Sequence, residues 1–207
     1  MTQSTYSYQP TQGHGLAHDP LNAIIAPRPI GWISSRSAAG QRNLAPYSFF
    51  NIFNYQPPII GFASSGWKDS VANIAETKEF VWNLVTKPLA QAMNQTSSPL
   101  PHGQDEFALA GLTPVKSQLI AVDRVAESPV HFECRLTQLI QLRDIQDKPI
   151  DSWLVLGEVV MIHIRTALLD EQGVYQTVEA APLLRAGGPS AYYGISDDQR
   201  IDLWRPS

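Results

Sequence analysis

The chain has 207 residues, 43% of them hydrophobic, which suits a single globular domain with a sizeable core. The formal net charge is −4 and no basic block occurs, which argues against nucleic-acid binding. No apolar run approaches the length of a membrane span and no early apolar run follows a basic start. We therefore expect no membrane partner and a cytoplasmic location.

Charged residues make up only 16% of the chain, against about 25% in typical soluble domains. A surface so poor in charge favours an oligomer, although a neutral surface rich in Ser, Gln and Asn would have the same composition. The single cysteine, Cys134, excludes an intrachain disulfide and a multi-cysteine metal site. It lies in an alternating strand pattern, so we expect a buried, unreactive thiol.

The chain begins with a polar segment, 1–15, that has no periodicity and is expected to form a flexible arm. The rest, 16–207, reads as one domain. Its apolar alternation or β-branched content predicts strands at 30–35, 45–53, 58–64, 79–85, 118–121, 130–143, 152–165 and 174–179. Short helices are expected at 70–77, with Asp69 or Ser70 as the N-cap, at 89–96, and as a turn at 105–110. Many strands with few short helices predict a mainly β fold, a barrel with helical insertions.

The segment from Ser64 to Ser70 combines a strand end, a lysine and a helix start. A helix N-terminus offers unpaired N–H groups and a positive dipole end, which suit a phosphate. Lys68 would add a point charge, and the hydroxyl groups of Ser64, Ser65 and Ser70 would add donors. The same residues would also fit an ordinary strand-to-helix turn with an exposed lysine.

A second segment, 43–51, could bind a flat ring. Pro46 should break the strand and free neighbouring N–H groups for a ligand. Tyr47, Phe49 and Phe50 would form aromatic walls. The polar groups offered to ring edges or to a polyol chain come from Asn43, Ser48 and Asn51. A kinked edge strand with core aromatics would have the same sequence.

Several motifs together resemble the flavin reductase-like family of FMN-binding split β-barrel proteins, in particular the flavin reductase components of two-component monooxygenases and the flavoredoxin-type proteins. These motifs are residues 26–35, 43–51, 68–70 with Asn73 and Ile74, 80–84, 101–103, 105–107 and 157–160. The similarity spans residues 16–188. It implies a mainly β, Greek-key type split barrel with short helical insertions.

The resemblance also implies a homodimer that binds FMN noncovalently and is reduced by NADH or NADPH. Backbone N–H groups around Ala45–Ser48 would then contact the ring. The cofactor-binding residues expected on this basis are Ser34, Ser35, Asn43, Ala45, Pro46, Tyr47, Ser48, Asn51, Ser64, Ser65, Lys68 and Ser70. Residues expected near a substrate are His102, Arg185 and Tyr192, but 186–194 and the short tail depart from the family pattern.

Two functions stay open on the sequence. The protein could be an NAD(P)H-dependent flavin reductase, with a flavin or another acceptor and with a monooxygenase or redox protein as partner. It could instead be an FMN-binding electron carrier without its own turnover. No side chain is required as a catalytic acid or base, because the chemistry would be centred on the flavin. Neither Ser34 nor Ser48 stands in a Gly-x-Ser-x-Gly hydrolase motif, and the five histidines have no metal-ligand spacing.

Overall fold

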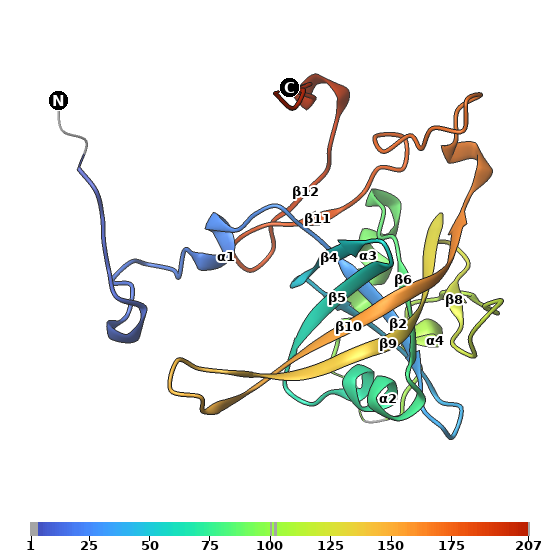
Figure 1. Ribbon diagram of the computed structural model, residues 1–207, viewed down its shortest axis with the longest axis horizontal. Helices are drawn as coiled ribbons and strands as arrows, with labels where there is room; N and C mark the ends of the chain where they lie inside the picture. Colours follow the sequence, from blue (N-terminus) through green and yellow to red (C-terminus); the bar gives the residue numbers. More distant parts are fainter. Residues whose placement is uncertain (1–3, 100, 102, 207) are drawn as a thin grey trace.

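The computed structural model describes residues 4–99, 101 and 103–206. Its centre is a seven-stranded antiparallel sheet with the strand order β3-β2-β6-β9-β10-β5-β4 (Figure 1). These strands are β2 (Gly31–Arg36), β3 (Arg42–Tyr47), β4 (Phe50–Tyr55), β5 (Pro58–Ser65), β6 (Glu79–Asn83), β9 (Val130–Arg143) and β10 (Pro149–Ile164). The two edge strands, β3 and β4, follow each other directly in the chain.

The sheet curls round one apolar core. Tyr47 of β3 and Phe62 of β5 lie near opposite edges of the sheet, yet their ring centroids are only 4.4 Å apart. Phe80 and Cys134 fill the middle of the same core. The sheet is therefore an open barrel whose edges come together at the turn between β3 and β4.

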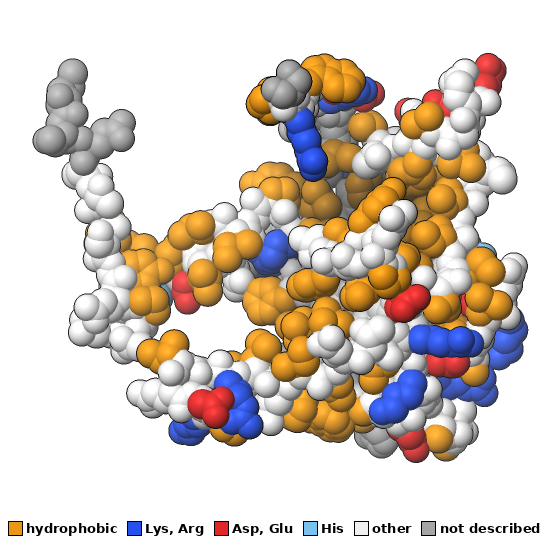
Figure 2. Space-filling view, viewed as in Figure 1, with side chains coloured by type: hydrophobic (Ala, Val, Ile, Leu, Met, Phe, Trp, Pro, Cys, Tyr) orange, Lys and Arg blue, Asp and Glu red, His pale blue; other side chains and the backbone are white. Residues whose placement is uncertain are grey.

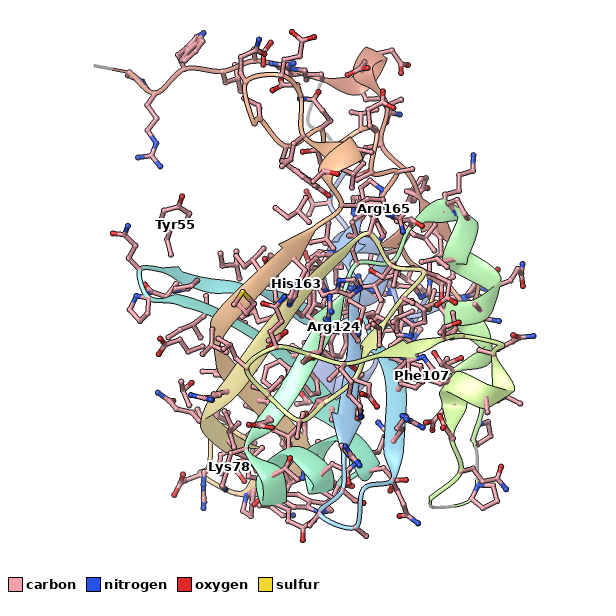
Figure 3. The ribbon with its side chains drawn as sticks, turned by 90° about the vertical axis from the view of Figure 1, so that its right-hand side faces the viewer. Tyr55, Lys78, Phe107, Arg124, His163 and Arg165 are labelled. Atoms are coloured by element: carbon pink, nitrogen blue, oxygen red, sulfur yellow. The ribbon has the colours of Figure 1, made fainter. Side chains whose placement is uncertain are left out.

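One helix, α2 (Asp69–Thr77), covers an end of the barrel and inserts Val71 and Ile74 into the core (Figure 1). A second apolar cluster, which includes Trp32, Leu44 and Phe107, lies on the other face of β2 and β3. It is covered by α3 (Ala90–Gln95) and α4 (Glu106–Leu109), and Figure 3 shows Phe107 on α4. Both helices therefore have a fixed position against β3.

The remaining elements are short. They are η1 (Pro10–Gln12), α1 (Leu21–Ile24), β1 (Arg28–Pro29), η2 (Lys87–Leu89), β7 (Pro114–Val115), β8 (Arg124–Val125), η3 (Thr166–Leu168), β11 (Leu184–Arg185), β12 (Tyr192–Tyr193) and η4 (Asp197–Gln199). Strands β1, β11 and β12 form a small separate sheet. Both ends of the chain extend away from the barrel (Figure 1).

Two predicted strands are wrong. Residues 118–121 are not a strand, because the Glu133 carboxylate accepts hydrogen bonds from the N–H groups of Gln118 and Leu119, which would otherwise bond to a neighbouring strand. Residues 174–179 form only an isolated bridge between Tyr175 and Leu169 and then a turn.

Two further details differ from the prediction. The strand expected at 45–53 is divided into β3 and β4, and the break lies at Ser48 and Phe49 rather than at Pro46. Pro46 sits inside β3, where an edge strand tolerates the missing N–H. The N-cap of α2 is Lys68, one residue earlier than expected.

Candidate functional site

A groove of about 530 Å³ lies between β3, the start of α2 and the segment after α3. This volume is in the range of small-molecule sites. Half of the twelve residues expected to bind a cofactor line it, namely Asn43, Ala45, Pro46, Tyr47, Lys68 and Ser70. The rest of its wall consists of Asp69, Glu106 and residues 96–99.

The start of α2 forms the positive end of this groove. Lys68 occupies the N-cap position with an extended backbone, and its side chain makes no capping hydrogen bond. The first-turn N–H groups of a helix have no partner within the helix, and the helix dipole adds positive potential there. The Lys68 side chain is exposed beside them. This end of the groove therefore has the donors and the charge that an anion needs.

A buried polar network fixes α2 to β3 below the groove. The Asn43 amide donates to Ser70 Oγ at 2.7 Å and to Ser35 Oγ at 3.3 Å. Asn73, one turn along α2, donates to the same Ser35 hydroxyl at 3.2 Å. Ser35 thus lies beneath the groove and holds the two residues that position its floor.

Tyr47 contributes to the wall from the end of β3. Its ring packs on Phe62 and is nearly buried. Burial raises the pKa of the Tyr47 hydroxyl, although hydrogen bonds with Ser70 and Ser64 oppose the rise. The hydroxyl therefore stays protonated at neutral pH and belongs to the network that orients Ser70.

The outer edge of β3 faces the groove through a limited set of backbone groups. Along an antiparallel edge strand, the N–H and C=O groups of successive residues point alternately toward the neighbouring strand and away from it. The Leu44 N–H points away from β2, to Glu106, so the N–H groups of Ala45 and Tyr47 point toward β2. Pro46 has no N–H. Within β3, the expected N–H donors at 45 and 47 are thus used by the sheet, and the outward groups near the groove are carbonyl oxygens.

Glu106 is a wall residue that the sequence did not single out. Its carboxylate accepts a hydrogen bond from Leu44 N at 3.0 Å, and the residue is only 8% exposed. Burial raises its pKa, the Leu44 N–H opposes the rise, and nearby Asp69 and Asp105 add to it. The sequence offered one signal, the Asp-Glu-Phe motif at 105–107, but only as part of the family resemblance. Residues 96–99 carried no signal.

The other six expected cofactor residues do not line the groove. Ser35 lies beneath it, as described. Ser34 is buried and donates to the carbonyl of Asp123 at 2.7 Å. Ser64 is buried and donates to the carbonyl of Gly66. Ser65 is exposed at the end of β5, where it pairs with Ser152 of β10. The carbonyl of Ser48 accepts a hydrogen bond from the Arg28 side chain, and Asn51 is exposed on β4.

The residues expected near a substrate lie elsewhere. His102 is outside the residues that the structure describes. Arg185 and Tyr192 pair in the small sheet, with the guanidinium carbon 5.0 Å from the ring centroid. Arg185 also donates to the carbonyls of Ala191 and Gly188. Neither side chain lines the groove beside β3.

A larger hollow of about 710 Å³ lies between residues 170–179 and 195–200. Its walls are turns and the C-terminal tail, and none of the expected site residues lines it. Neither the edge of a sheet strand nor a helix as long as α2 lines this hollow. We therefore take the groove beside β3 as the functional site.

Three other expectations concern the cysteine, metal ligands and membrane-spanning helices. Cys134 is fully buried, and burial raises the pKa of its thiol well above the usual value, so it is unreactive at neutral pH. Over the described ranges, no group of three or more His, Cys, Asp or Glu is placed to hold a metal ion. Within those ranges, no helix has both the length and the apolar content to cross a membrane.

Comparison with known proteins gives a family match. The model of the flavin reductase like domain matches residues 25–183. An uncharacterized protein of Aquifex aeolicus is 35% identical over 170 residues, which are 80% of this chain and 83% of that protein. The uncharacterized protein YwrF of Bacillus subtilis is 30% identical over 192 residues, 90% and 92% of the two chains.

Solved structures agree. Nitrilotriacetate monooxygenase component B from Bacillus cereus has a TM-score of 0.88 and 30% identity, covering 98% of this chain and 100% of its own. The 2-nitrobenzoate 2-nitroreductase NbaA of Pseudomonas fluorescens has a TM-score of 0.77 and 31% identity, covering 90% and 88%. A flavin reductase with a split barrel domain from Shewanella frigidimarina has a TM-score of 0.78 at 20% identity and 88% and 89% coverage, which concerns the fold alone. The predicted split-barrel fold is confirmed.

Proposed function

The chain belongs to the flavin reductase-like domain family, and from this premise we propose that the groove beside β3 binds FMN noncovalently and that the protein is an NADH- or NADPH-dependent flavin reductase. One observation carries the proposal: the groove joins a helix N-terminus and a lysine, Lys68, to the edge of a strand. A phosphate and a flat heterocycle with polar edges need these two features side by side.

The residues present fit FMN by their chemistry. The N-terminus of α2, Lys68 and the Ser70 hydroxyl suit the phosphate. The outward carbonyl groups of β3 suit N–H donors on the ring edge, and Tyr47 gives an apolar wall. The Asn43–Ser35–Asn73 network keeps these groups in place without a ligand. A preformed site of this kind loses little free energy in ordering when it binds.

Bound FMN would supply the hydride and electron chemistry, and the protein would bind and orient it. In the groove, Lys68 and the α2 N-terminus would anchor the phosphate, and β3 with Tyr47 would hold the ring. Since both nicotinamide cofactors occur in the cytoplasm, we place the activity there. The monooxygenase component and the nitroreductase among the similar structures support a partner or an acceptor that receives the electrons.

We further propose a homodimer. The edge strand β4 exposes large apolar side chains, and Figure 2 shows hydrophobic side chains gathered on this part of the molecule. In Figure 3, Tyr55 lies at the outer end of the β4–β5 hairpin and points away from the barrel. The exposed members of this surface are Phe49, Ile52, Phe53 and Tyr55, with Ile24 and Ile25 beside them. An uncovered apolar edge strand is a strong candidate for pairing with a second copy.

The test is anaerobic reduction of the FMN-loaded protein. Purified protein mixed with FMN should show a perturbed flavin spectrum with one FMN per chain. Addition of NADH or NADPH should then bleach the flavin band within seconds to minutes. Bleaching only by a reduced partner protein would select the electron carrier instead, and lack of flavin binding in either redox state would reject both functions.

A further inference from the structure

Glu106 is an acidic side chain in a groove that is proposed to bind an anionic cofactor. It is the first residue of α4, and Asp105 caps this helix by accepting from Phe107 N at 2.9 Å. Phe107 is buried in the second apolar cluster and packs the helix against β3. The Glu106 carboxylate is further fixed by the bond from Leu44 N at 3.0 Å. These contacts hold the carboxylate in the wall of the groove.

The charges around Glu106 do not neutralise it. Asp69 on α2 lines the same groove, and Asp105 precedes it on its own helix. Arg42 on β3 is bound to Asp123 at 2.7 Å and lies 3.5 Å from Asp105. Lys68 stands at the start of α2, and its side chain is exposed. The groove thus has the α2 N-terminus and Lys68 at one end, where Asp69 also lies, and the Glu106 carboxylate in its wall at α4.

This distribution of charge would orient a bound FMN molecule. A phosphate dianion is repelled by a carboxylate and attracted by Lys68 and the α2 N-terminus. The phosphate would therefore take the α2 end and leave the uncharged oxidised ring near β3 and Glu106. Reduction by hydride transfer from a nicotinamide moves a proton and an electron pair from the donor to the ring, and near neutral pH the reduced ring carries a negative charge.

We propose that the Glu106 carboxylate sets the redox preference of the bound flavin by disfavouring its negatively charged reduced form. This inference rests on the proposed function, because it needs FMN in the groove. A fixed negative charge in a partly buried site destabilises a second negative charge more strongly than water-exposed charges do. The bound flavin would be a stronger reductant, ready to pass electrons to an acceptor, and the oxidised form would bind more tightly than the reduced form.

The experiment compares the FMN-loaded wild type with Glu106→Gln. Glutamine keeps an oxygen that accepts from Leu44 N but removes the charge. We expect the affinity for reduced FMN, relative to oxidised FMN, to rise about tenfold, which for a two-electron couple corresponds to an increase of about 30 mV in midpoint potential. The midpoint potential is measured by slow anaerobic reduction with a reference dye, at several pH values. The two proteins should converge at low pH, where Glu106 is protonated.

The control is Glu171→Gln, which removes one charge from an exposed turn and should leave the potential unchanged. Riboflavin has the ring but no phosphate, so the difference in midpoint potential between the wild type and Glu106→Gln should persist with riboflavin.

If Glu106→Gln changes the affinity for both redox states of FMN equally, Glu106 acts on the phosphate and the inference is overturned. An unchanged potential also overturns it, whereas a wild type that binds no flavin overturns the proposed function as well. If the variant fails to fold, the pH dependence of the wild-type potential decides, since a pH profile without a Glu106 ionisation contradicts the inference.

Discussion

Lys68 is the residue that most directly separates phosphate binding from ring binding. We predict that Lys68→Ala lowers FMN affinity roughly tenfold to a hundredfold, because loss of a charge-assisted contact costs about 1.5–3 kcal/mol. The side chain is exposed, so the fold should be unaffected. Fluorescence titration of the apoprotein with FMN gives the dissociation constant.

Riboflavin is the matched control ligand, since it has the ring and lacks the phosphate. Its affinity should barely change in Lys68→Ala. Equal losses for FMN and riboflavin would mean that Lys68 does not contact the phosphate. Lys116→Ala is a suitable control variant, because Lys116 also forms a charged contact, with Asp123 at 2.9 Å, but does not line the groove.

His131 should make the stability depend on pH. Burial lowers the pKa of His131 to about 4, and the ring is fixed by a 2.7 Å contact with the carbonyl of Val125. An unfolded histidine has a pKa of about 6.5, so between these values the unfolded chain binds more protons. Stability should therefore fall, by about 2–3 kcal/mol, as the pH drops from about 6.5 to about 4.

Denaturant unfolding at several pH values measures this slope. His131→Gln can keep a donor toward the Val125 carbonyl but cannot titrate, so its stability should vary less over the same pH range. His18→Gln is the control, because His18 is exposed. A slope that is the same in the wild type and in His131→Gln would exclude His131 as its source.

At the scale of elements, Glu133 of β9 holds the segment 116–122 against the barrel. Its buried carboxylate accepts from Gln118 N and Leu119 N, both at 2.8 Å, and lies 2.6 Å from His163 Nε2. Burial would raise its pKa, but these donors outweigh it and the pKa is lowered. We predict that Glu133→Ala costs about 3–5 kcal/mol, because it leaves buried donors unpaired.

Thermal or denaturant unfolding checks this, with Glu171→Ala as the exposed control. Hydrogen exchange adds a local measurement: the amides of Gln118 and Leu119 should lose protection before the amides of β9. A loss of stability below about 1 kcal/mol would show that this anchor is not important.

The sequence predicted most of the barrel because its long strands carry their own signal. The predicted strand 130–143 matches β9, and the predicted strand 152–165 begins three residues after β10 begins and ends one residue after β10 ends. The failures occur where side chains replace backbone pairing. Residues 118–121 have the composition of a strand, but the N–H groups of Gln118 and Leu119 bond to the carboxylate of Glu133, and the N–H of Ala121 bonds to the carboxylate of Glu79. No local pattern reveals such a distant acceptor.

The candidate site was predicted in part for a related reason. Lys68, Ser70 and the 43–47 segment are close in sequence to a strand end or a helix start, so local patterns place them. Ser34 and Ser64 have the right residue type, but their hydroxyl groups are used inside the structure. Glu106 belongs to the site only because α4 packs against β3, a tertiary contact that local patterns do not contain.

At the scale of the whole molecule, the apolar surface of β4 predicts a dimer that buries more than the ~1,600 Å² of a standard interface. Phe53 is 55% exposed on this strand. We predict that Phe53→Asp dissociates the dimer at micromolar concentration, because a charge would be buried at the interface. Val174→Asp is the control, since Val174 is similarly exposed, at 57%, but lies in a remote turn.

Light scattering over a dilution series, with and without FMN, measures the assembly. If FMN contacts both subunits, it should shift the equilibrium toward the dimer, because a ligand stabilises the state that binds it. A wild-type monomer that binds FMN with full affinity would show that FMN does not need both subunits, while leaving flavin binding itself intact.

FMN is proposed to occupy the groove between β3 and α2. A crystal structure of the protein grown with FMN would show where the cofactor binds. We expect the phosphate against the N-terminus of α2 and Lys68, with the ring beside Ala45–Tyr47 and facing the α4 wall. Well-ordered FMN in the hollow between residues 170–179 and 195–200, with the groove beside β3 empty, would contradict it.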